Sequence, residues 1–473
     1  MKSDDPVLAL LKAAAGERGW VEQPADREPY ERDFRRRYQG KAALVLRPAT
    51  TNAVARILAI CDERRVGVVP HGGNTSYCGG ATPDSSGGQV VLSLERLNRI
   101  RSVDALDYSI TVEAGCVLAD VQAAAERADR LFPLSLGSEG SCQIGGNLST
   151  NAGGTAVLRY GMMRDLVLGL EVVLADGRVL DVLRALRKDN RGYDLKQLFV
   201  GAEGTLGIIT AATLKLFPLP ASRATAICAV PTPAAAVELL SVIRRRAGGT
   251  LTTFELMPRI AVALTALHVQ GVRDPFGAAH PWYVLLELSG AQADIELEEL
   301  LERALAEGAD QELVADAALA SSGEQREAMW KLRESIPEAQ RREGPGLKHD
   351  VSVPITAIAR FIALAGDWLA ANVPDGEVVA YGHLGDGSLH FNVQQRRGTD
   401  PQEFLARAPA VRRAIHDLAA QLNGSFSAEH GIGQAKVEEL ERYKGPVELE
   451  LMRKLKRTLD PHGILNPGKV LRN

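Results

Sequence analysis

Residues 136–154 have the sequence Leu136-Gly-Ser-Glu-Gly-Ser-Cys-Gln-Ile-Gly-Gly-Asn-Leu-Ser-Thr-Asn-Ala-Gly-Gly154. Glycine is interleaved here with serine, threonine and asparagine, and similar clusters lie at 71–80 and 201–209. Glycine lets a backbone approach a ligand closely, and the N–H groups of glycine-rich turns bind phosphate oxygens. Any one cluster could be a set of tight turns. Three clusters in one region favour a large pyrophosphate cofactor wrapped by loops.

The segments around these clusters predict alternating strands and helices, with helices at 6–20 and 118–128 and a hairpin around Ala175-Asp-Gly177. The first cluster, which begins His71-Gly-Gly-Asn-Thr-Ser, matches neither a Walker A loop nor the G-x-G-x-x-G pattern. After Pro218 and Pro220 the composition changes, which indicates a domain boundary. The pattern that follows is β-α-β-β-α-β, which is typical of an α+β sandwich.

Composition excludes several classes of protein. The chain has 473 residues, is 45% hydrophobic and 24% charged, and carries a formal net charge of −4. This charge argues against a nucleic-acid surface, and no apolar run approaches the roughly 20 residues that span a bilayer. The acidic start at Met1 is not typical of a secretory signal. The five scattered cysteines predict no disulfide framework, so a reducing, cytoplasmic location is expected.

A second informative stretch, Val378–Val393, predicts a β-hairpin around the turn Asp386-Gly387. Counting outward from that turn places His383 opposite His390. Side chains alternate with a period of two, so one face carries Tyr381, His383, His390 and Asn392, and the other carries Leu384, Leu389 and Phe391.

Directly opposed residues have Cβ atoms roughly 4.5–5.5 Å apart, so both imidazoles could reach one metal ion. Glu429, in Ser427–Gly433, is a candidate third ligand. Two histidines and a carboxylate with an open fourth position are typical of a catalytic zinc site. The alternative is a polar sheet face without a metal.

Six motifs come in an order that resembles FAD-linked 2-hydroxyacid dehydrogenases of the vanillyl-alcohol oxidase / p-cresol methylhydroxylase flavoprotein fold. They are Pro70–Thr75, Gly145–Gly154, Glu203–Thr210, Gly382–Asn392, Glu429–Gly433 and Asn466–Lys469. The resemblance extends over nearly the whole chain and is greatest to the D-2-hydroxyglutarate dehydrogenases, with D-lactate and glycolate dehydrogenases as near relatives.

The resemblance implies an α+β fold with three parts. Residues 1–218 would form an FAD-binding domain of two subdomains, and 219–422 a ferredoxin-like α+β substrate domain with an antiparallel sheet. Residues 423–473 would form a C-terminal helical segment that completes the active site and returns to the FAD domain. The implied FAD-binding residues are Gly72, Gly73, Asn74, Thr75, Gly79, Gly80, Gly137, Ser138, Ser141, Gly145, Asn147, Thr150, Asn151, Gly154, Gly204, Gly207, Ile209 and Asn466. Thr75 aligns with a histidine that tethers FAD in some members of this fold, so noncovalent FAD is expected.

The resemblance also implies roles in catalysis. His383, His390 and Glu429 would bind a divalent metal, expected to be zinc, and His430 would be the general base. Arg333, Lys348, Asn392 and Tyr381 would contact the substrate, the two cations suiting a second carboxylate. One departure is Pro337, where the 2-hydroxyglutarate enzymes carry threonine, which puts the chain length of the substrate in doubt.

The expected activity is oxidation of a D-2-hydroxyacid, foremost D-2-hydroxyglutarate to 2-oxoglutarate. Reduced FAD would pass electrons to an acceptor such as an electron-transfer flavoprotein or a quinone, and a homodimer is one expected assembly. Three alternatives stay open: a D-lactate or glycolate dehydrogenase, a flavin-free zinc hydrolase, and a subunit of a larger oxidase complex.

Overall fold

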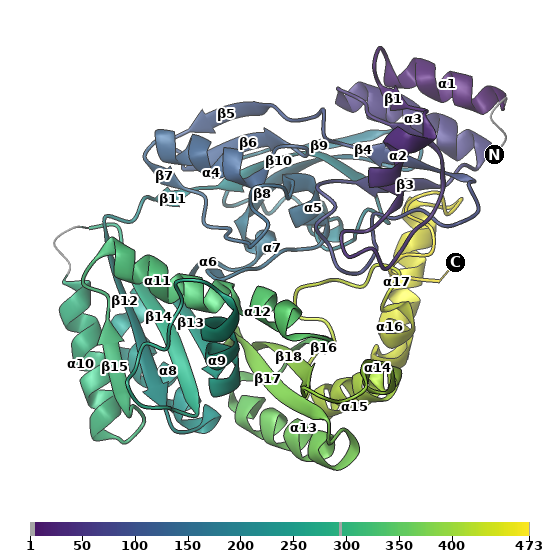
Figure 1. Cartoon of the computed structure of the whole chain (residues 1–473). Helices are drawn as coiled ribbons and strands as arrows, with labels where there is room; N and C mark the ends of the chain where they lie inside the picture. The colour runs from purple at the N-terminus through teal and green to yellow at the C-terminus, as the bar shows by residue number, and fades with distance from the viewer. Residues whose placement is uncertain (1–4, 293–295, 473) are drawn as a thin grey trace. The chain divides into compact units, whose positions relative to one another are not determined.

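The computed structural model describes residues 5–292 and 296–472, which divide into two compact units (Figure 1). The first unit contains Met1–Gly154, Gly161–Leu219 and Glu429–Asn473, and the second contains Thr155–Tyr160 and Pro220–Ala428. Each unit is therefore assembled from segments that are far apart in the sequence.

The first unit contains a mainly parallel sheet in the order β1-β2-β4-β3 and an antiparallel sheet in the order β5-β6-β10-β8-β9. Strands β7 and β11 form a separate pair. The strands are β1 Trp20–Val21, β2 Ala42–Leu46, β3 Val68–His71, β4 Gln89–Ser93, β5 Ile100–Asp104, β6 Ser109–Glu113, β7 Arg130–Leu131, β8 Val167–Val173, β9 Val179–Val182, β10 Ile208–Lys215 and β11 Phe217–Pro218. The helices are α1 Pro6–Ala15, α2 Pro24–Glu31, α3 Thr51–Arg64, α4 Leu118–Arg127, α5 Ile144–Ser149, α7 Met163–Leu166, α16 Val437–Tyr443 and α17 Pro446–Leu459, with the 3-10 turn η1 Leu195–Leu198.

Helix α3 shows how the sequence positions these elements. The Thr50 side chain accepts a hydrogen bond from the backbone N–H of Ala53 and caps the first turn. Val54, Ile57 and Leu58 recur at helical spacing and are buried against strands of the parallel sheet. The helix ends at Arg64, and Arg65 adopts a left-handed conformation.

The predicted helix at 6–20 is shorter in the structure. Helix α1 ends at Ala15 because Gly16 turns the chain with a φ of 81° and its N–H bonds back to Lys12. Trp20 then belongs to β1, where it pairs with Leu46 of β2. Trp20 packs on the same core as Leu8 and Leu11 of α1, but from the edge of the sheet.

The second unit is built on one sheet in the order β15-β12-β14-β13-β17-β18-β16, in which all neighbours are antiparallel. Its strands are β12 Ser222–Val230, β13 Leu251–Pro258, β14 Trp282–Gly290, β15 Asp316–Leu319, β16 Gly346–Ser352, β17 Gly376–His383 and β18 Ser388–Gln395. The helices are α6 Val157–Tyr160, α8 Pro233–Ala247, α9 Arg259–His268, α10 Leu297–Asp310, α11 Gly323–Glu334, α12 Ile336–Glu343, α13 Ile358–Asn372, α14 Pro401–Ala406 and α15 Ala408–Gln421, with 3-10 turns η2 Gly248–Thr250, η3 Ile355–Ala357 and η4 Leu384–Asp386.

The chain order β12-α8-β13-β14-α10-β15, with α9 inserted between β13 and β14, and the spatial order β15-β12-β14-β13 confirm the predicted ferredoxin-like arrangement. Strands β17, β18 and β16 extend this sheet beyond β13.

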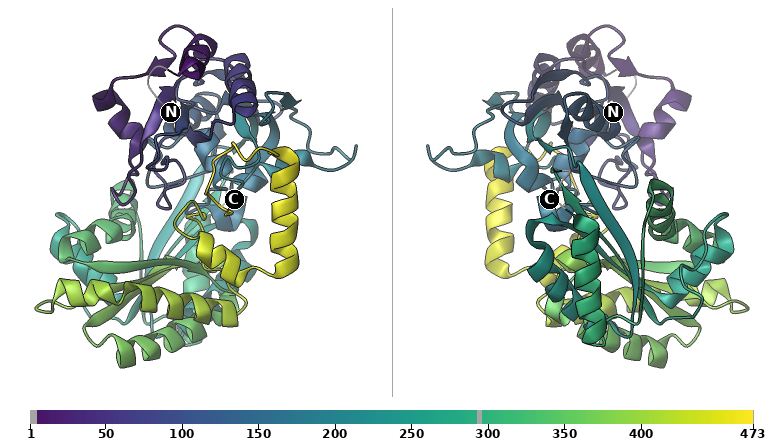
Figure 2. Two further views of the ribbon diagram at one scale, coloured as in Figure 1. Left: turned by 90° about the vertical axis from the view of Figure 1, so that its right-hand side faces the viewer. Right: turned by 90° about the vertical axis from the view of Figure 1, so that its left-hand side faces the viewer.

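Helices cover both faces of the extended sheet (Figure 2). Helices α8, α10, α13 and α15 pack on one face, where the largest apolar core lies. Helices α9, α11 and α12 contribute to a smaller core on the other face. Leu384, Leu389 and Phe391 are fully buried in the large core, which confirms their predicted common face. The opposite face of β17 and β18 is therefore the one that carries their polar side chains.

The predicted register of the hairpin is wrong by two residues. Tyr381, not His383, pairs with His390. The predicted two-residue turn is replaced by the 3-10 turn η4, after which Gly387 has a φ of 86°. His383 pairs instead with Glu255 on β13. A shift of two residues leaves every side chain on its predicted face, because the side-chain period of a strand is also two.

Among the described residues, no helix has both the length and the apolar character needed to cross a bilayer. The five cysteines all lie in the described part of the chain, where they are buried and form no disulfide.

Candidate active site

One face of the sheet in the second unit gathers polar side chains from four neighbouring strands. Strand pairing places Glu255 beside His383, Asp350 beside His390, and Lys348 beside Asn392. The ring centroids of His383 and His390 are 5.6 Å apart, and those of Tyr381 and His390 are 5.1 Å apart. The structure thus confirms that Tyr381, His383, His390 and Asn392 share a face.

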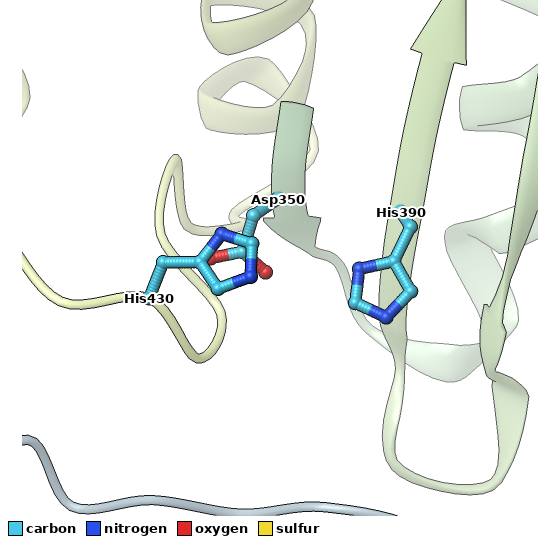
Figure 3. A group of neighbouring side chains, drawn as sticks. All are labelled: Asp350, His390 and His430. Carbon is cyan, nitrogen blue, oxygen red and sulfur yellow. The ribbon is translucent and has the colours of Figure 1, made fainter. Parts of the chain in front are cut away.

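Two sets of side chains in the described part of the chain could each hold a metal ion. One set is His383, His390 and Glu429, and the other is Asp350, His390 and His430 (Figure 3). Within each set, the potential ligand atoms lie within 4.8 Å of one another. Figure 3 shows Asp350 and His390 on neighbouring strands and His430 on a loop. Both sets contain His390, and the first is the set predicted from the sequence.

Sequence reasoning missed Asp350. Lys348 and Asp350 are two residues apart on β16, so they project from the same face of that strand. That spacing was a usable signal once residues 346–352 had been recognised as a strand, which the composition of this segment does not indicate. Asp350 is buried, at 3% exposure.

Sequence reasoning also missed Glu255. This residue is 1% exposed and lies in the middle of β13. One carboxylate oxygen lies 2.6 Å from Nδ1 of His383, and the other accepts a hydrogen bond of 2.8 Å from Nε of Arg333. Burial alone would raise the pKa of Glu255, but His383 and Arg333 hold that pKa at about 2, so the carboxylate is ionised at neutral pH.

Arg333, predicted to bind a substrate carboxylate, lies near the end of α11 and is 6% exposed. Its guanidinium lies 4.9 Å from the ring centroid of Tyr381, so it packs over the polar sheet face. Asn392 is also held from this side, because its amide donates to the Gln340 side chain on α12 at 2.9 Å. Pro337 lies in the first turn of α12, where proline is well tolerated. Lys348 is exposed.

In the first unit, the loop that carries His430 is anchored by a half-buried acid, Glu203. Both oxygens of Glu203 accept backbone hydrogen bonds from this loop, from Ile432 at 2.7 Å and from Gly433 at 2.8 Å. The thiol of Cys78 lies 3.4 Å from the Gly431 carbonyl oxygen. The loop is therefore fixed to the glycine clusters at 71–80 and 201–209.

The His430 ring is packed as well as anchored. Tyr77 meets it edge to face, with ring centroids 4.7 Å apart. The guanidinium of Arg35 lies on the Tyr77 ring, 3.5 Å from its centroid. This stack restricts the orientations that the imidazole can adopt within the first unit.

The glycine clusters approach one another closely in the first unit. A Cβ on Gly73 would lie 2.2 Å from the Ser141 carbonyl oxygen, and a Cβ on Gly204 would lie 2.4 Å from the Pro70 ring. The side-chain amide of Asn466 donates to the carbonyl oxygens of Gly80 and Glu203, which joins two clusters.

Several features of these clusters fit a bound polar cofactor. The side-chain oxygens of Gln143 and Asn466 are buried and have no hydrogen-bond partner among the described residues. A Cβ on Gly137 or Gly146 would meet no described atom within 4 Å. Burial lowers the pKa of His71 to about 4, so this residue is a neutral imidazole at the start of the first cluster. The clusters therefore offer backbone N–H groups and neutral polar side chains rather than cations.

Not every predicted FAD residue faces open space. Gly207 packs against Val172 and Phe199, and Ile209 is buried in β10. Asn74 donates to the Arg32 carbonyl oxygen. The remaining side chains shape their own loops: the Thr150 hydroxyl donates to Gly146, Asn151 accepts from the Arg164 N–H, and Ser141 donates to Ser138. The structure explains these residues by loop conformation and packing.

Two glycine variants should separate packing from cofactor binding. Gly73→Ala should lower the Tm of the apoprotein, because overpacking costs at least about 1–3 kcal/mol and the clash is with backbone. Gly137→Ala should leave the apoprotein Tm unchanged but weaken FAD binding, since the space beside it is open. Thermal unfolding and flavin titration of the apoprotein measure both effects. Unchanged flavin affinity in Gly137→Ala would remove this residue from the cofactor site.

Comparison with known proteins identifies the chain's relatives. Residues 42–183 match the family described as "FAD binding domain", and residues 219–470 match "FAD linked oxidases, C-terminal domain". The mitochondrial D-2-hydroxyglutarate dehydrogenase of Bos taurus is 42% identical over 99% of this chain and 84% of its own length. The D-2-hydroxyglutarate dehydrogenase of Xanthomonas citri pv. viticola is 37% identical over 98% of this chain and 97% of its own length.

Solved structures show the same fold at low sequence identity. A structure of p-cresol methylhydroxylase with substrate bound is 17% identical, has a TM-score of 0.76, and matches over 99% of this chain and 97% of its own. A structure of alkyldihydroxyacetonephosphate synthase is 18% identical, has a TM-score of 0.74, and matches over 98% of this chain and 86% of its own. The predicted vanillyl-alcohol oxidase / p-cresol methylhydroxylase fold is confirmed, and the FAD-binding match removes the flavin-free hydrolase alternative. The chain therefore belongs to the FAD-linked oxidase family that includes the D-2-hydroxyglutarate dehydrogenases.

Proposed function

We propose that this chain is an FAD- and metal-dependent dehydrogenase that oxidises D-2-hydroxyglutarate to 2-oxoglutarate. The observation that carries the proposal is the polar sheet face, where two histidines, an asparagine and an arginine held by a buried acid gather over neighbouring strands. The names of relatives that match nearly the whole chain support this choice of substrate.

His383, His390 and Glu429 are proposed to bind the metal. A divalent ion bound to the substrate hydroxyl lowers the pKa of that hydroxyl and orients the acid. Two imidazoles and a carboxylate suit zinc, and manganese, cobalt and iron bind such sets as well. Asp350 and His430 offer the other carboxylate and imidazole that could join His390 in a ligand set.

His430 is proposed to remove the hydroxyl proton. Histidine changes protonation near neutral pH, which suits a general base. The Glu203 hydrogen bonds and the Tyr77 ring hold the His430 loop in one conformation. FAD, when bound, accepts the hydride from C2 of the substrate.

Arg333, Lys348, Asn392 and Tyr381 are proposed to bind the substrate. A guanidinium binds carboxylates bidentately, and Arg333 already lies over the sheet face. A D-lactate or glycolate dehydrogenase is the rival within the family, since its substrate has no distal carboxylate.

FAD is proposed to bind noncovalently, because Thr75 has no imidazole nitrogen that could form a covalent bond to it. The glycine clusters, which contain most of the predicted FAD-binding residues, are proposed to form the loops that hold FAD. An electron-transfer flavoprotein or a quinone is the proposed electron acceptor, and a homodimer the proposed assembly. The buried cysteines of the described chain form no disulfide, which favours a reducing compartment, proposed to be the cytoplasm.

The experiment that tests this function measures turnover of D- and L-2-hydroxyacids with an artificial electron acceptor, before and after chelation. We expect the highest kcat/KM with D-2-hydroxyglutarate and loss of activity after chelation, reversed by added metal. A preference for D-lactate or glycolate would favour the rival. Full activity after exhaustive chelation would refute the metal. Inactivity of the purified chain that is relieved by other proteins would favour the subunit of a complex.

Arg333→Ala should raise KM for D-2-hydroxyglutarate far more than for D-lactate, by about 10–100-fold, because truncating a charged carboxylate partner costs about 1.5–3 kcal/mol. Steady-state kinetics with both acids measures this difference. Arg326→Ala is the matched control, since Arg326 also lies on α11 and pairs with a buried acid, Glu287. Equal KM changes for the two acids would count against a dicarboxylate site.

A further inference from the structure

Glu255 is a buried acidic residue whose neighbours along the strand are apolar. It lies on β13 between Phe254 and Leu256, both of which are buried in the large core on the opposite face. An ionised carboxylate that is removed from water needs charged or hydrogen-bonded partners on its own face. Glu255 finds two such partners, and both belong to the proposed active site.

The first partner is His383, whose Nδ1 lies 2.6 Å from Oε1 of Glu255. Two guanidinium nitrogens of Arg333 contact the same carboxylate. A carboxylate paired with a guanidinium accepts hydrogen bonds, so Nδ1 of His383 is the donor of this contact. The other ring nitrogen, Nε2, is then the atom that can bind a metal. Carboxylates that receive the second N–H of a metal-binding histidine fix its tautomer and ring orientation.

The second partner is Arg333, which uses one edge of its guanidinium. Both Nε and Nη2 approach Oε2 of Glu255, at 2.8 and 2.7 Å. A guanidinium is planar with five N–H donors, so the Nη1 group stays available for another acceptor. Tyr381 lies against the same guanidinium, and the arginine is therefore held in one orientation over the sheet face.

We propose that Glu255 is a positioning residue. It holds the metal-binding nitrogen of His383 and the substrate-binding edge of Arg333 in fixed positions relative to each other. The inference rests on the proposed function, which assigns the metal to His383 and the substrate carboxylate to Arg333. From its position on β13, the Glu255 carboxylate thereby fixes the distance between the metal and Arg333, the cation proposed to bind the substrate carboxylate.

Glu287 provides the contrast. It is a second buried acid, on β14, and its side chain projects from the same face of the sheet as Glu255. Arg326, Trp330 and Thr225 donate to it. Glu287 thus has the environment of a structural ion pair without a histidine or a proposed substrate ligand, which makes Glu287→Gln a matched control.

The test is Glu255→Gln in the full-length protein, with metal affinity measured by competition against a chromophoric chelator. Glutamine has one acceptor oxygen and one donor amide, so it can satisfy His383 or Arg333 but not both. Metal affinity should fall by about 10–100-fold, and KM for D-2-hydroxyglutarate should rise. Flavin content and Tm report folding. Metal affinity equal to that of Glu287→Gln would overturn the inference.

The double variant Glu255→Gln/Arg333→Met provides a second readout that tolerates a loss of stability in the single variant. Methionine removes the competing donor, so the glutamine oxygen can accept from Nδ1 of His383. Metal affinity should return toward the wild-type value, while KM for the dicarboxylate stays high. No recovery would overturn the tautomer role. The metal content of His390→Ala distinguishes a failure of the proposed metal site from a failure of the role of Glu255. If both His390→Ala and Glu255→Gln keep the metal, the proposed metal site fails. If only His390→Ala loses the metal, the metal site stands and the role of Glu255 fails.

Discussion

Replacing His390 with alanine should remove the bound metal and nearly all turnover while leaving the flavin in place. His390 is the residue shared by both sets of potential ligands, so its loss breaks either arrangement. A metal that polarises the substrate lowers the barrier by several kcal/mol, and each 1.4 kcal/mol or so is a factor of ten in rate. We therefore expect kcat/KM to fall by about a thousandfold. Elemental analysis, the flavin absorbance spectrum and steady-state kinetics measure the three outcomes.

Two further variants decide which set of ligands holds the metal. His383→Ala should release the metal if His383, His390 and Glu429 bind it, and Asp350→Ala should then retain it. The reverse result would assign the metal to Asp350, His390 and His430. His268→Ala is the control, because His268 pairs with Glu343 and belongs to neither set of potential ligands. A His390→Ala protein that keeps both metal and activity would refute the metal site.

The fold could be predicted because its signals are local or ordered along the chain. The motifs from Pro70 to Asn466 occur in the family's order, and the helix predicted at 118–128 is present as α4, Leu118–Arg127. The common face of His383 and His390 was also predictable, because it depends only on a period of two within each strand.

The features that the sequence did not predict correctly depend on interactions between residues that are distant in the sequence. The register of the hairpin follows from the 3-10 turn at Leu384–Asp386 and from the pairing of His383 with Glu255, 128 residues earlier in the chain. Glu255 itself is one glutamate in an apolar strand, and such a residue reveals its partners only when the strands are aligned. Glu203 begins the motif Glu203–Thr210. Its hydrogen bonds to the His430 loop could not be predicted, because they connect residues 229 and 230 positions apart.

Replacing His430 with alanine should lower kcat by about 10²–10⁴-fold, which is the usual contribution of a general base. KM should change little, because Arg333 and Asn392 are proposed to bind the acid. Stopped-flow reduction of the flavin measures the step directly, and added imidazole should restore part of the rate by entering the space that the side chain leaves. Tyr77→Phe is the control, since it keeps an aromatic ring against His430.

The metal content of the His430→Ala protein then distinguishes a base from a ligand. A base at position 430 leaves the metal bound to His383, His390 and Glu429, so slow flavin reduction should coincide with a full complement of metal. If the metal is lost as well, His430 belongs to the second set, with Asp350 and His390. A rate within about threefold of wild type would exclude both roles, since loss of a general base costs at least about a hundredfold. Because Glu203 holds the same loop through the N–H groups of Ile432 and Gly433, Glu203→Gln should produce a milder loss of rate with His430 still present.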